Sequence, residues 1–124
     1  MASRPDHARP TISTHVLDAE LGMPAVGVHV IVYRLDGGAP IRITQALTDS
    51  DGRVRDLLDR PIVAGDYRLE FNLSPDRNAD SPTPAPAERF FRRLSIDMRI
   101  DDVGRSYHVP LLLSSFAMTT YRGS

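Results

Sequence analysis

The 124-residue sequence contains no cysteine, no lysine and no tryptophan. Without cysteine there is neither a disulfide nor a catalytic thiolate, which argues against a disulfide-stabilised secreted scaffold. No apolar run is long enough to form a signal peptide or to span a membrane. The formal net charge of −1 gives no basic excess for contacts with nucleic acid. We therefore expect a cytoplasmic protein that associates with neither membranes nor nucleic acids.

Proline and glycine are frequent, with ten and eight residues, and they divide the chain into short apolar segments. Residues 26–35 give the strongest strand signal, because they are dense in β-branched side chains and an Asp-Gly-Gly turn follows them. Similar patterns predict strands at residues 11–18, 41–48, 53–58, 67–73, 90–100, 107–113 and 117–121. About seven or eight short strands separated by turns indicate an all-β sandwich of two sheets.

Two segments fall outside this pattern of strands. The proline-rich residues 74–88 are the least regular, and one short helix is expected at residues 75–79, since Ser74 can cap it and Pro75 suits its first position. The polar residues 1–10 are expected to form a flexible arm. No internal repeat or linker divides the rest, so a single domain is predicted over residues 11–124.

Four short motifs contain residues suited to chemistry. They are Ser13-Thr14-His15, Asp51-Gly52-Arg53, Tyr107-His108-Val109-Pro110 and Tyr121-Arg122-Gly123-Ser124. Taken singly, each has a plain structural explanation, because a lone strand histidine is usually packed or solvated and terminal residues usually fray. His7, in the arm, and His29, inside the strongest strand, are expected to have no catalytic role. Neither has a metal-ligand spacing, so no metal is expected, although His15 and His108 could bind zinc if they met in space.

In combination and in order, these motifs resemble the 5-hydroxyisourate hydrolases of the transthyretin-related family. The resemblance covers nearly the whole chain from Thr11, and the Tyr-Arg-Gly-Ser ending is its most specific part. The shared segments are Ser13-Thr14-His15-Val16-Leu17-Asp18, Gly22-Met23-Pro24-Ala25, Tyr33-Arg34, the Thr-x-x-Asp-Gly-Arg turn at 48–53, Gly65-Asp66-Tyr67, residues 107–112 and residues 120–124.

This resemblance implies a transthyretin-like (prealbumin-like) β-sandwich without a cofactor or metal. The implied reaction is hydrolysis of 5-hydroxyisourate to 2-oxo-4-hydroxy-4-carboxy-5-ureidoimidazoline in urate degradation. A homotetramer is implied as well, with its pocket where subunits meet, and the apolar residues 110–113 and Phe116 would be hard to bury in a monomer. The residues carried over as catalytic are His15, Arg53, His108 and Ser124, and those carried over as substrate-binding are Arg53, Tyr121, Arg122, Gly123 and Ser124.

Opening a ring amide with water requires a base for the water, an acid for the departing nitrogen and stabilisation of an oxyanion. Imidazoles titrate near neutral pH, so His15 and His108 suit the proton transfers, and which of them is the base stays open. The planar guanidinium of Arg53 suits adjacent carbonyl and anionic ring groups.

Some positions differ from the family pattern, and three other functions need to be weighed. Ser106, Ser115 and Met118 replace a histidine, a proline and a tyrosine that are common there, which leaves open a hydrolase of a related cyclic ureide. Transthyretin, a non-catalytic small-molecule carrier, lacks the early histidine and the Tyr-Arg-Gly-Ser ending. This chain has both features, so a carrier function is disfavoured. A structural prealbumin-like module does not explain His15, His108 and that ending together.

Overall fold

The computed structural model describes residues 9–73 and 90–123. In this part of the chain all the regular secondary structure is β-strand. In chain order they are β1 (Ile12–Asp18), β2 (Met23–Pro24), β3 (His29–Leu35), β4 (Ile41–Leu47), β5 (Arg53–Val54), β6 (Gly65–Asn72), β7 (Arg93–Ile100), β8 (Tyr107–Leu113) and β9 (Met118–Thr120). The helix expected at residues 75–79, most of the arm expected at residues 1–10, and Ser124 lie outside the described residues. Within those residues no helix is long and apolar enough to cross a membrane.

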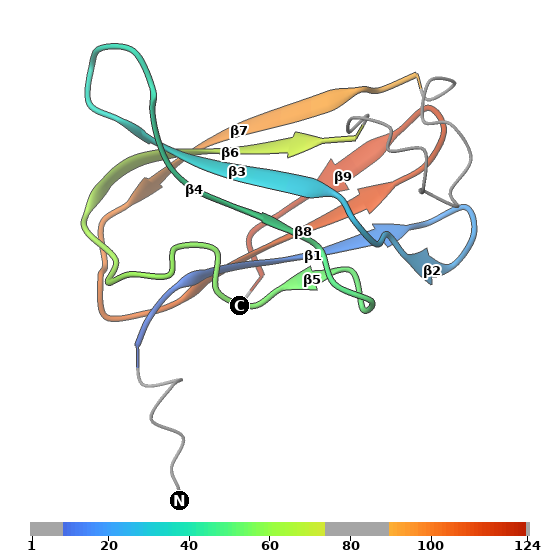
Figure 1. The fold of residues 1–124 in the computed structure, drawn as a ribbon, viewed down its shortest axis with the longest axis horizontal. Coiled ribbons are helices and arrows are strands. Elements are labelled where there is room, and N and C mark those ends of the chain that lie inside the picture. The colour runs from blue at the N-terminus through green and yellow to red at the C-terminus, as the bar shows by residue number, and fades with distance from the viewer. Residues whose placement is uncertain (1–8, 74–89, 124) are drawn as a thin grey trace, which may run out of the picture.

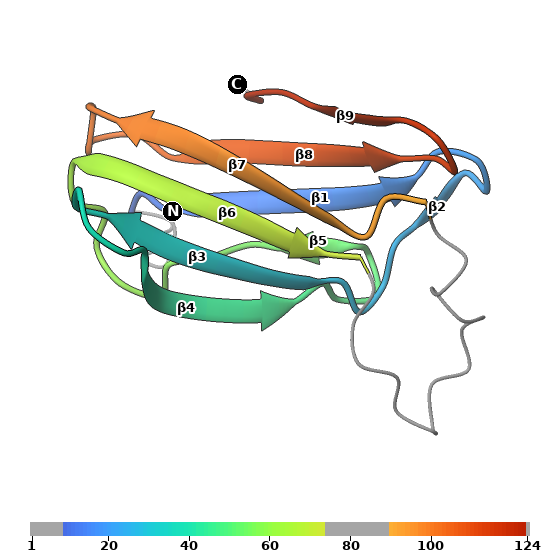
Figure 2. The same ribbon diagram turned by 90° about the horizontal axis from the view of Figure 1, so that it is seen from above.

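The strands form two sheets that pack face to face, which confirms the predicted all-β sandwich (Figure 1). The first sheet has the order β2-β1-β8-β9, with β5 also paired to β1, and the second has the order β4-β3-β6-β7. β1 and β8 run parallel, whereas the other paired strands run antiparallel. Seen from above, β7 and β9 lie on the same side of the sandwich, each as the last strand of its sheet (Figure 2).

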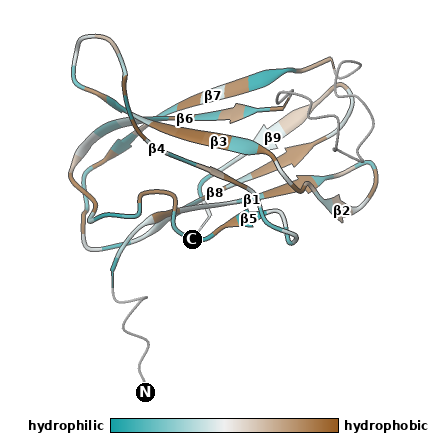
Figure 3. Cartoon of the chain, viewed as in Figure 1, coloured by the Kyte–Doolittle hydropathy of each residue, from teal (hydrophilic) through white to brown (hydrophobic). Residues whose placement is uncertain are grey.

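The core lies between the sheets and follows from the alternation of side chains along each strand. In β6, Tyr67, Leu69 and Phe71 are buried, whereas Arg68 and Glu70 between them are partly exposed. Figure 3 shows the same alternation of apolar and polar residues along the strands. Each fully buried side chain of this size stabilises the fold by about 1.5–3 kcal/mol relative to its exposed state. The alternation therefore also decides which residues face outward and are free for chemistry.

Residues 9–73 and 90–123 contain nine strands, whereas seven or eight were expected. The additional strand β2 was taken for part of a turn, because it has only two residues. The Asp18 carboxylate accepts hydrogen bonds from the amides of Glu20 and Leu21, both at 3.0 Å, and the Gly22 amide donates to the Asp18 carbonyl at 2.8 Å. This tight turn brings Met23 back beside Asp18 and so creates the short pairing.

Two of the family-like motifs have a structural function. Arg34, at the end of β3, donates to the carbonyl of Ala64 at 2.7 Å and to the Tyr67 hydroxyl at 3.0 Å. Tyr67 in turn donates to the carbonyl of Val63 at 2.5 Å, and the Arg34 guanidinium lies 5.0 Å from the centre of the Tyr67 ring. The Tyr-Arg and Gly-x-Tyr motifs therefore fasten the loop before β6 to the end of β3.

Candidate active site

The outward-facing residues of β1, β5 and β8 form one polar surface, which we call the outer face of the first sheet. Alternate residues of β1 are buried, and this leaves Ser13 and His15 on the side away from the core. Ser13 lies opposite His108 of β8, and His15 lies opposite Arg53 of β5. Partners in such a register share one face of the sheet, so three segments distant in sequence bring these four side chains together.

Arg53 is held by the turn that precedes it. The Asp49 carboxylate accepts hydrogen bonds from the amides of Asp51 at 2.8 Å and Arg53 at 3.0 Å, and these bonds, that of Arg53 first, keep the pKa of Asp49 below its usual value. Gly52 has a φ of +76°, and its carbonyl oxygen accepts a hydrogen bond from the Val16 amide at 2.7 Å. A Cβ at Gly52 would collide with the carbonyl oxygen of Val16. The Asp-Gly-Arg motif therefore allows this turn to lie close to β1 and positions Arg53 on the outer face.

His108 is oriented by a hydrogen bond across the parallel pair of strands. Its Nδ1 lies 2.8 Å from the Ser13 hydroxyl oxygen, at a partly buried position. Burial is the main cause that lowers the pKa of His108 below its ordinary value, and the positive charges of Arg53 and His15 add to this effect. This shift of the pKa favours the neutral form of the ring, which can accept a proton.

A cavity of about 220 Å³ opens on the outer face beside these groups. Its walls include both predicted residues Arg53 and His108. The full lining is Ser13, Thr14, Arg53, Val54, Arg55 and His108. His15 is not part of this lining, but it lies on the same face one register step further along β1. The structure thus brings Arg53 and His108 together in one cavity, with His15 next to it.

The C-terminal segment also contacts His108. The Gly123 amide donates to the His108 carbonyl at 2.7 Å, which forms an isolated bridge. A Cβ on Gly123 would lie 2.9 Å from Cδ2 of His108, closer than real Cβ atoms come to a ring. The glycine of the Tyr-Arg-Gly-Ser motif is therefore required by the close approach of the segment to the imidazole. Ser124 follows it directly in the sequence but lies beyond the described residues.

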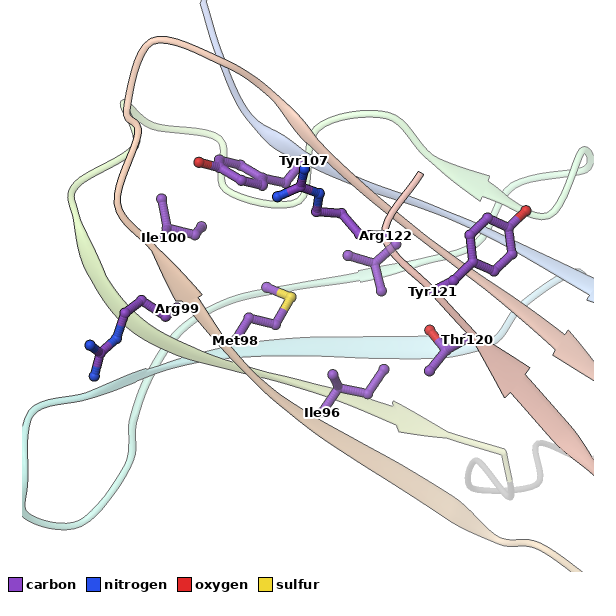
Figure 4. Close-up of a pocket in the computed structure, with 9 residues that line it drawn as sticks. Ile96, Met98, Arg99, Ile100, Tyr107, Thr120, Tyr121 and Arg122 are labelled. Carbon is purple, nitrogen blue, oxygen red and sulfur yellow. The ribbon is translucent and has the colours of Figure 1, made fainter. Parts of the chain in front are cut away.

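Tyr121 and Arg122 line a different cavity, of about 270 Å³, between the edges of the two sheets. Figure 4 shows Met98 and Ile100 pointing from β7 into this space, whereas the Tyr121 ring points away from Met98. The other residues of the lining are Ile96, Arg99, Tyr107, Val109 and Thr120. Within one chain, the C-terminal motif therefore divides: Gly123 contacts His108, and the two residues before it border an apolar cavity.

Four residues of the His108 cavity had not been predicted as site residues: Ser13, Thr14, Val54 and Arg55. Ser13 stands two positions before His15, and residues two apart on a strand share a face, so its place beside the site could have been read from the period of the strand. Arg55 stands two positions after Arg53 and could have been found by the same rule. No group of three or more His, Asp or Glu side chains suited to a metal comes together among residues 9–73 and 90–123.

Comparisons with known proteins place the chain among relatives of one kind. The family model described as the HIUase/Transthyretin family matches residues 12–123. The chain is similar to a protein of Rhizobium meliloti named 5-hydroxyisourate hydrolase 2, with 41% identity over 120 residues that cover 91% of this chain and 95% of the relative.

Solved structures agree with this match. The structure of Klebsiella pneumoniae 5-hydroxyisourate hydrolase superposes with a TM-score of 0.73 at 30% identity, covering 93% of this chain and 99% of the other. Sea bream transthyretin in complex with thyroxine superposes with a TM-score of 0.74 at 25% identity, covering 90% of this chain and 93% of the other. The predicted transthyretin-like form of the sandwich is confirmed by both.

Proposed function

Because the chain belongs to the HIUase/Transthyretin family, we propose that it hydrolyses 5-hydroxyisourate to 2-oxo-4-hydroxy-4-carboxy-5-ureidoimidazoline in urate degradation. Relatives similar over almost the whole chain bear the name of this hydrolase. The observation that carries the proposal is the cavity that Arg53 shares with His108, whose ring is hydrogen-bonded to Ser13, with His15 on the same face of the sheet. This set supplies a base, a cation and a second imidazole, which is what ring opening by water requires.

In the proposed reaction, His108 removes a proton from water, and the water oxygen bonds to a ring carbonyl carbon. Arg53 binds the carbonyl and stabilises the negative charge that forms on its oxygen, since its guanidinium offers a planar pair of donors. The ring carbon–nitrogen bond then breaks, a proton passes from an imidazole to the departing nitrogen, and the carbonyl carbon becomes a carboxylic acid, which releases its proton to solvent and leaves a carboxylate. His15 and His108 are proposed to carry these protons, a role supported by their positions on paired strands of the same sheet.

The C-terminal residues complete the proposed site. Gly123 contacts His108, and Ser124 is the next residue in the sequence, which supports the proposal that Ser124 is a catalytic residue. Tyr121, Arg122 and Gly123 are proposed to bind substrate together with Ser124. For Tyr121 and Arg122, which border the second cavity in one chain, this role requires a neighbouring subunit to bring them to a site.

A homotetramer is therefore part of the proposal. β7 and β9 are both terminal strands of their sheets, and the apolar cavity between them is open in the single chain. Of the apolar residues thought hard to bury, Pro110, Leu111 and Leu113 are buried within one chain, Leu112 is partly exposed and Phe116 is 78% exposed. Two open edges and an uncovered aromatic support association between copies. We place this assembly in the cytoplasm, where a protein without cysteine needs no disulfides.

The test is to generate 5-hydroxyisourate in situ with urate oxidase and to follow its ultraviolet absorbance with and without the protein. The proposal predicts accelerated decay and one product, identified by its newly formed carboxylate. Decay at the spontaneous rate, from a protein shown to be folded, would contradict it.

The similarity to a transthyretin that binds thyroxine makes a carrier the second candidate. Thyroxine binding by a folded protein that leaves 5-hydroxyisourate unaffected would favour that function. Hydrolysis of another cyclic ureide, but not of 5-hydroxyisourate, would favour a related hydrolase and would direct attention to Ser106, Ser115 and Met118.

A further inference from the structure

The hydrogen bond between Ser13 and His108 has geometry that fixes one nitrogen of the ring. Ser13 and His108 are direct partners in the parallel register of β1 and β8, so both backbones are held by the sheet. The hydroxyl oxygen lies 2.8 Å from Nδ1, within normal hydrogen-bond range. Both residues also line the same cavity. With Nδ1 occupied by Ser13, Nε2 is the nitrogen left to meet a substrate or a water.

A second contact prevents the ring from turning away. Gly123 lies against the Cδ2 edge of the imidazole, where a Cβ would come within 2.9 Å. Its amide also holds the His108 backbone through the bond to the carbonyl, at 2.7 Å. The ring is therefore restrained on the Nδ1 side by a hydroxyl and on the Cδ2 side by a glycine backbone.

The partner of Nδ1 determines what Nε2 does. When a neutral histidine carries its proton on Nδ1, Nε2 has a free lone pair and acts as a base, and the partner of the other nitrogen selects this form. A carboxylate partner would also stabilise the imidazolium and raise the pKa of the ring. A hydroxyl accepts the Nδ1 proton without adding a charge, so it orients the ring and leaves it neutral.

The charged groups around the ring make an uncharged partner useful. His15 from β1 and Arg53 from β5 lower the pKa of His108, after the larger effect of burial. Arg55 lines the same cavity, and the C-terminal segment adds the Gly123 backbone. These positive charges favour the neutral ring, provided that the Nδ1 partner does not stabilise the imidazolium.

We propose that Ser13 is a positioning residue for the hydrolysis: its hydroxyl accepts the Nδ1 proton of His108 and so keeps the Nε2 lone pair directed into the cavity as the base. This inference rests on the proposed function and deepens it, because it names the reacting nitrogen. It assigns His108, and not His15, to the first proton transfer. Ser13 itself need not touch the substrate.

The test compares Ser13→Ala, which removes the hydroxyl, with Ser13→Thr, which keeps it on a side chain suited to a strand. Ser95→Ala is the matched control, because Ser95 is an exposed strand serine of β7 on the other sheet. Two readouts are used: kcat and KM with 5-hydroxyisourate generated in situ, and nuclear magnetic resonance of the His108 ring nitrogens in the substrate-free protein.

We expect Ser13→Ala to lower kcat at least about 10-fold while KM changes less than about 3-fold, since proton transfer is affected and binding is not. Ser13→Thr should restore kcat to within about 3-fold of the parent, and Ser95→Ala should not change it. The His108 proton should lie on Nδ1 in the parent and the threonine variant, and should shift toward Nε2 in the alanine variant.

Three results would overturn the inference: unchanged kcat in Ser13→Ala, equal losses in the alanine and threonine variants, or a parent ring protonated on Nε2. The nitrogen measurement needs no substrate. A parent without hydrolase activity would therefore refute the proposed function, whereas the ring nitrogens would still decide whether Ser13 selects the His108 tautomer.

Discussion

His108 has neighbours on three sides, and each affects a different property of its ring. Ser13 holds Nδ1, Gly123 limits rotation, and Arg53 with His15 opposes the uptake of a proton. The effect of Arg53 and His15 is electrostatic and acts at longer range. Removing one of these charges therefore separates it from the effects of Ser13 and Gly123. The charge effect and the contact with Gly123 can therefore be tested independently.

The pKa of His108 should rise when a neighbouring positive charge is removed. Burial, Arg53 and His15 all disfavour the imidazolium, so the parent ring should titrate below the ordinary histidine value and the acid side of the pH–rate profile should fall there too. In Arg53→Gln one opposing charge is absent, and the midpoint should move to higher pH. Titration of the His108 ring by nuclear magnetic resonance measures this directly. A midpoint that stays in place or moves to lower pH would refute the charge effect.

Gly123→Ala should impair turnover more than stability. The new Cβ would lie 2.9 Å from Cδ2 of His108, so the ring must shift, and a displacement of about 1 Å near the chemistry can cost up to about 100-fold in rate. We expect kcat to fall between about 10- and 100-fold. The control is Gly38→Ala, where nothing lies within 4 Å of the added Cβ. Equal kcat values for the two variants would show that the ring is not restrained by Gly123.

At the scale of elements, the turn between β4 and β5 positions Arg53. Its Thr48 is buried, donates to the Ala25 carbonyl at 2.7 Å and accepts from the Val28 amide at 2.9 Å. Asp49 holds the amide of Arg53, and Gly52 passes close to β1. The Thr-x-x-Asp-Gly-Arg motif is thus a structural unit with one functional residue at its end.

Gly52→Ala should destabilise the fold through this turn. The residue has a left-handed φ of +76°, and an added Cβ meets the backbone of Val16, which cannot give way as a flexible side chain would. A loss of about 2 kcal/mol or more in the free energy of unfolding is expected. Urea denaturation measures it, with Gly38→Ala expected to change stability by less than about 0.5 kcal/mol. A Gly52 variant as stable as the control would contradict the role assigned to the turn.

Particular elements show what could be predicted from the sequence. β6 alternates strongly, and its buried side can be read from the sequence because one side chain in two is large and apolar. β2 was missed, since its two residues pair only after the Asp18 turn forms. Arg53 and His108 were assigned by resemblance, but their shared cavity depends on the pairing of β1 with both β5 and β8, which no local pattern encodes. Ser13 was missed for the same reason, because its importance arises only from its partner across the strands.

At the scale of the whole molecule, the single chain leaves surfaces that a second copy would cover. The edge strands β7 and β9 border an apolar cavity, and Phe116 in the β8–β9 connection lies near Phe90, with ring centroids 6.0 Å apart. Both rings are well exposed. Burial of such surfaces between subunits is favourable by about 25 cal/mol per Å².

The assembly should have four times the mass of one chain. One chain has a mass of 13.7 kDa, so four times 13.7 kDa gives about 55 kDa for the homotetramer. Sedimentation at the concentrations used for activity measures this mass. A fully active species of 13.7 kDa would contradict a site that depends on neighbouring subunits.

The central claim is that His108 on the outer face performs the hydrolysis of 5-hydroxyisourate. The most direct measurement compares His108→Asn with His29→Asn in the absorbance assay, because His29 lies on β3 of the other sheet and bonds to Gln45 at 2.5 Å. We predict that His108→Asn lowers kcat/KM by about 100-fold or more, since it removes the base, and that His29→Asn retains the parent rate. A folded His108→Asn variant that hydrolyses the substrate at the parent rate would contradict the account.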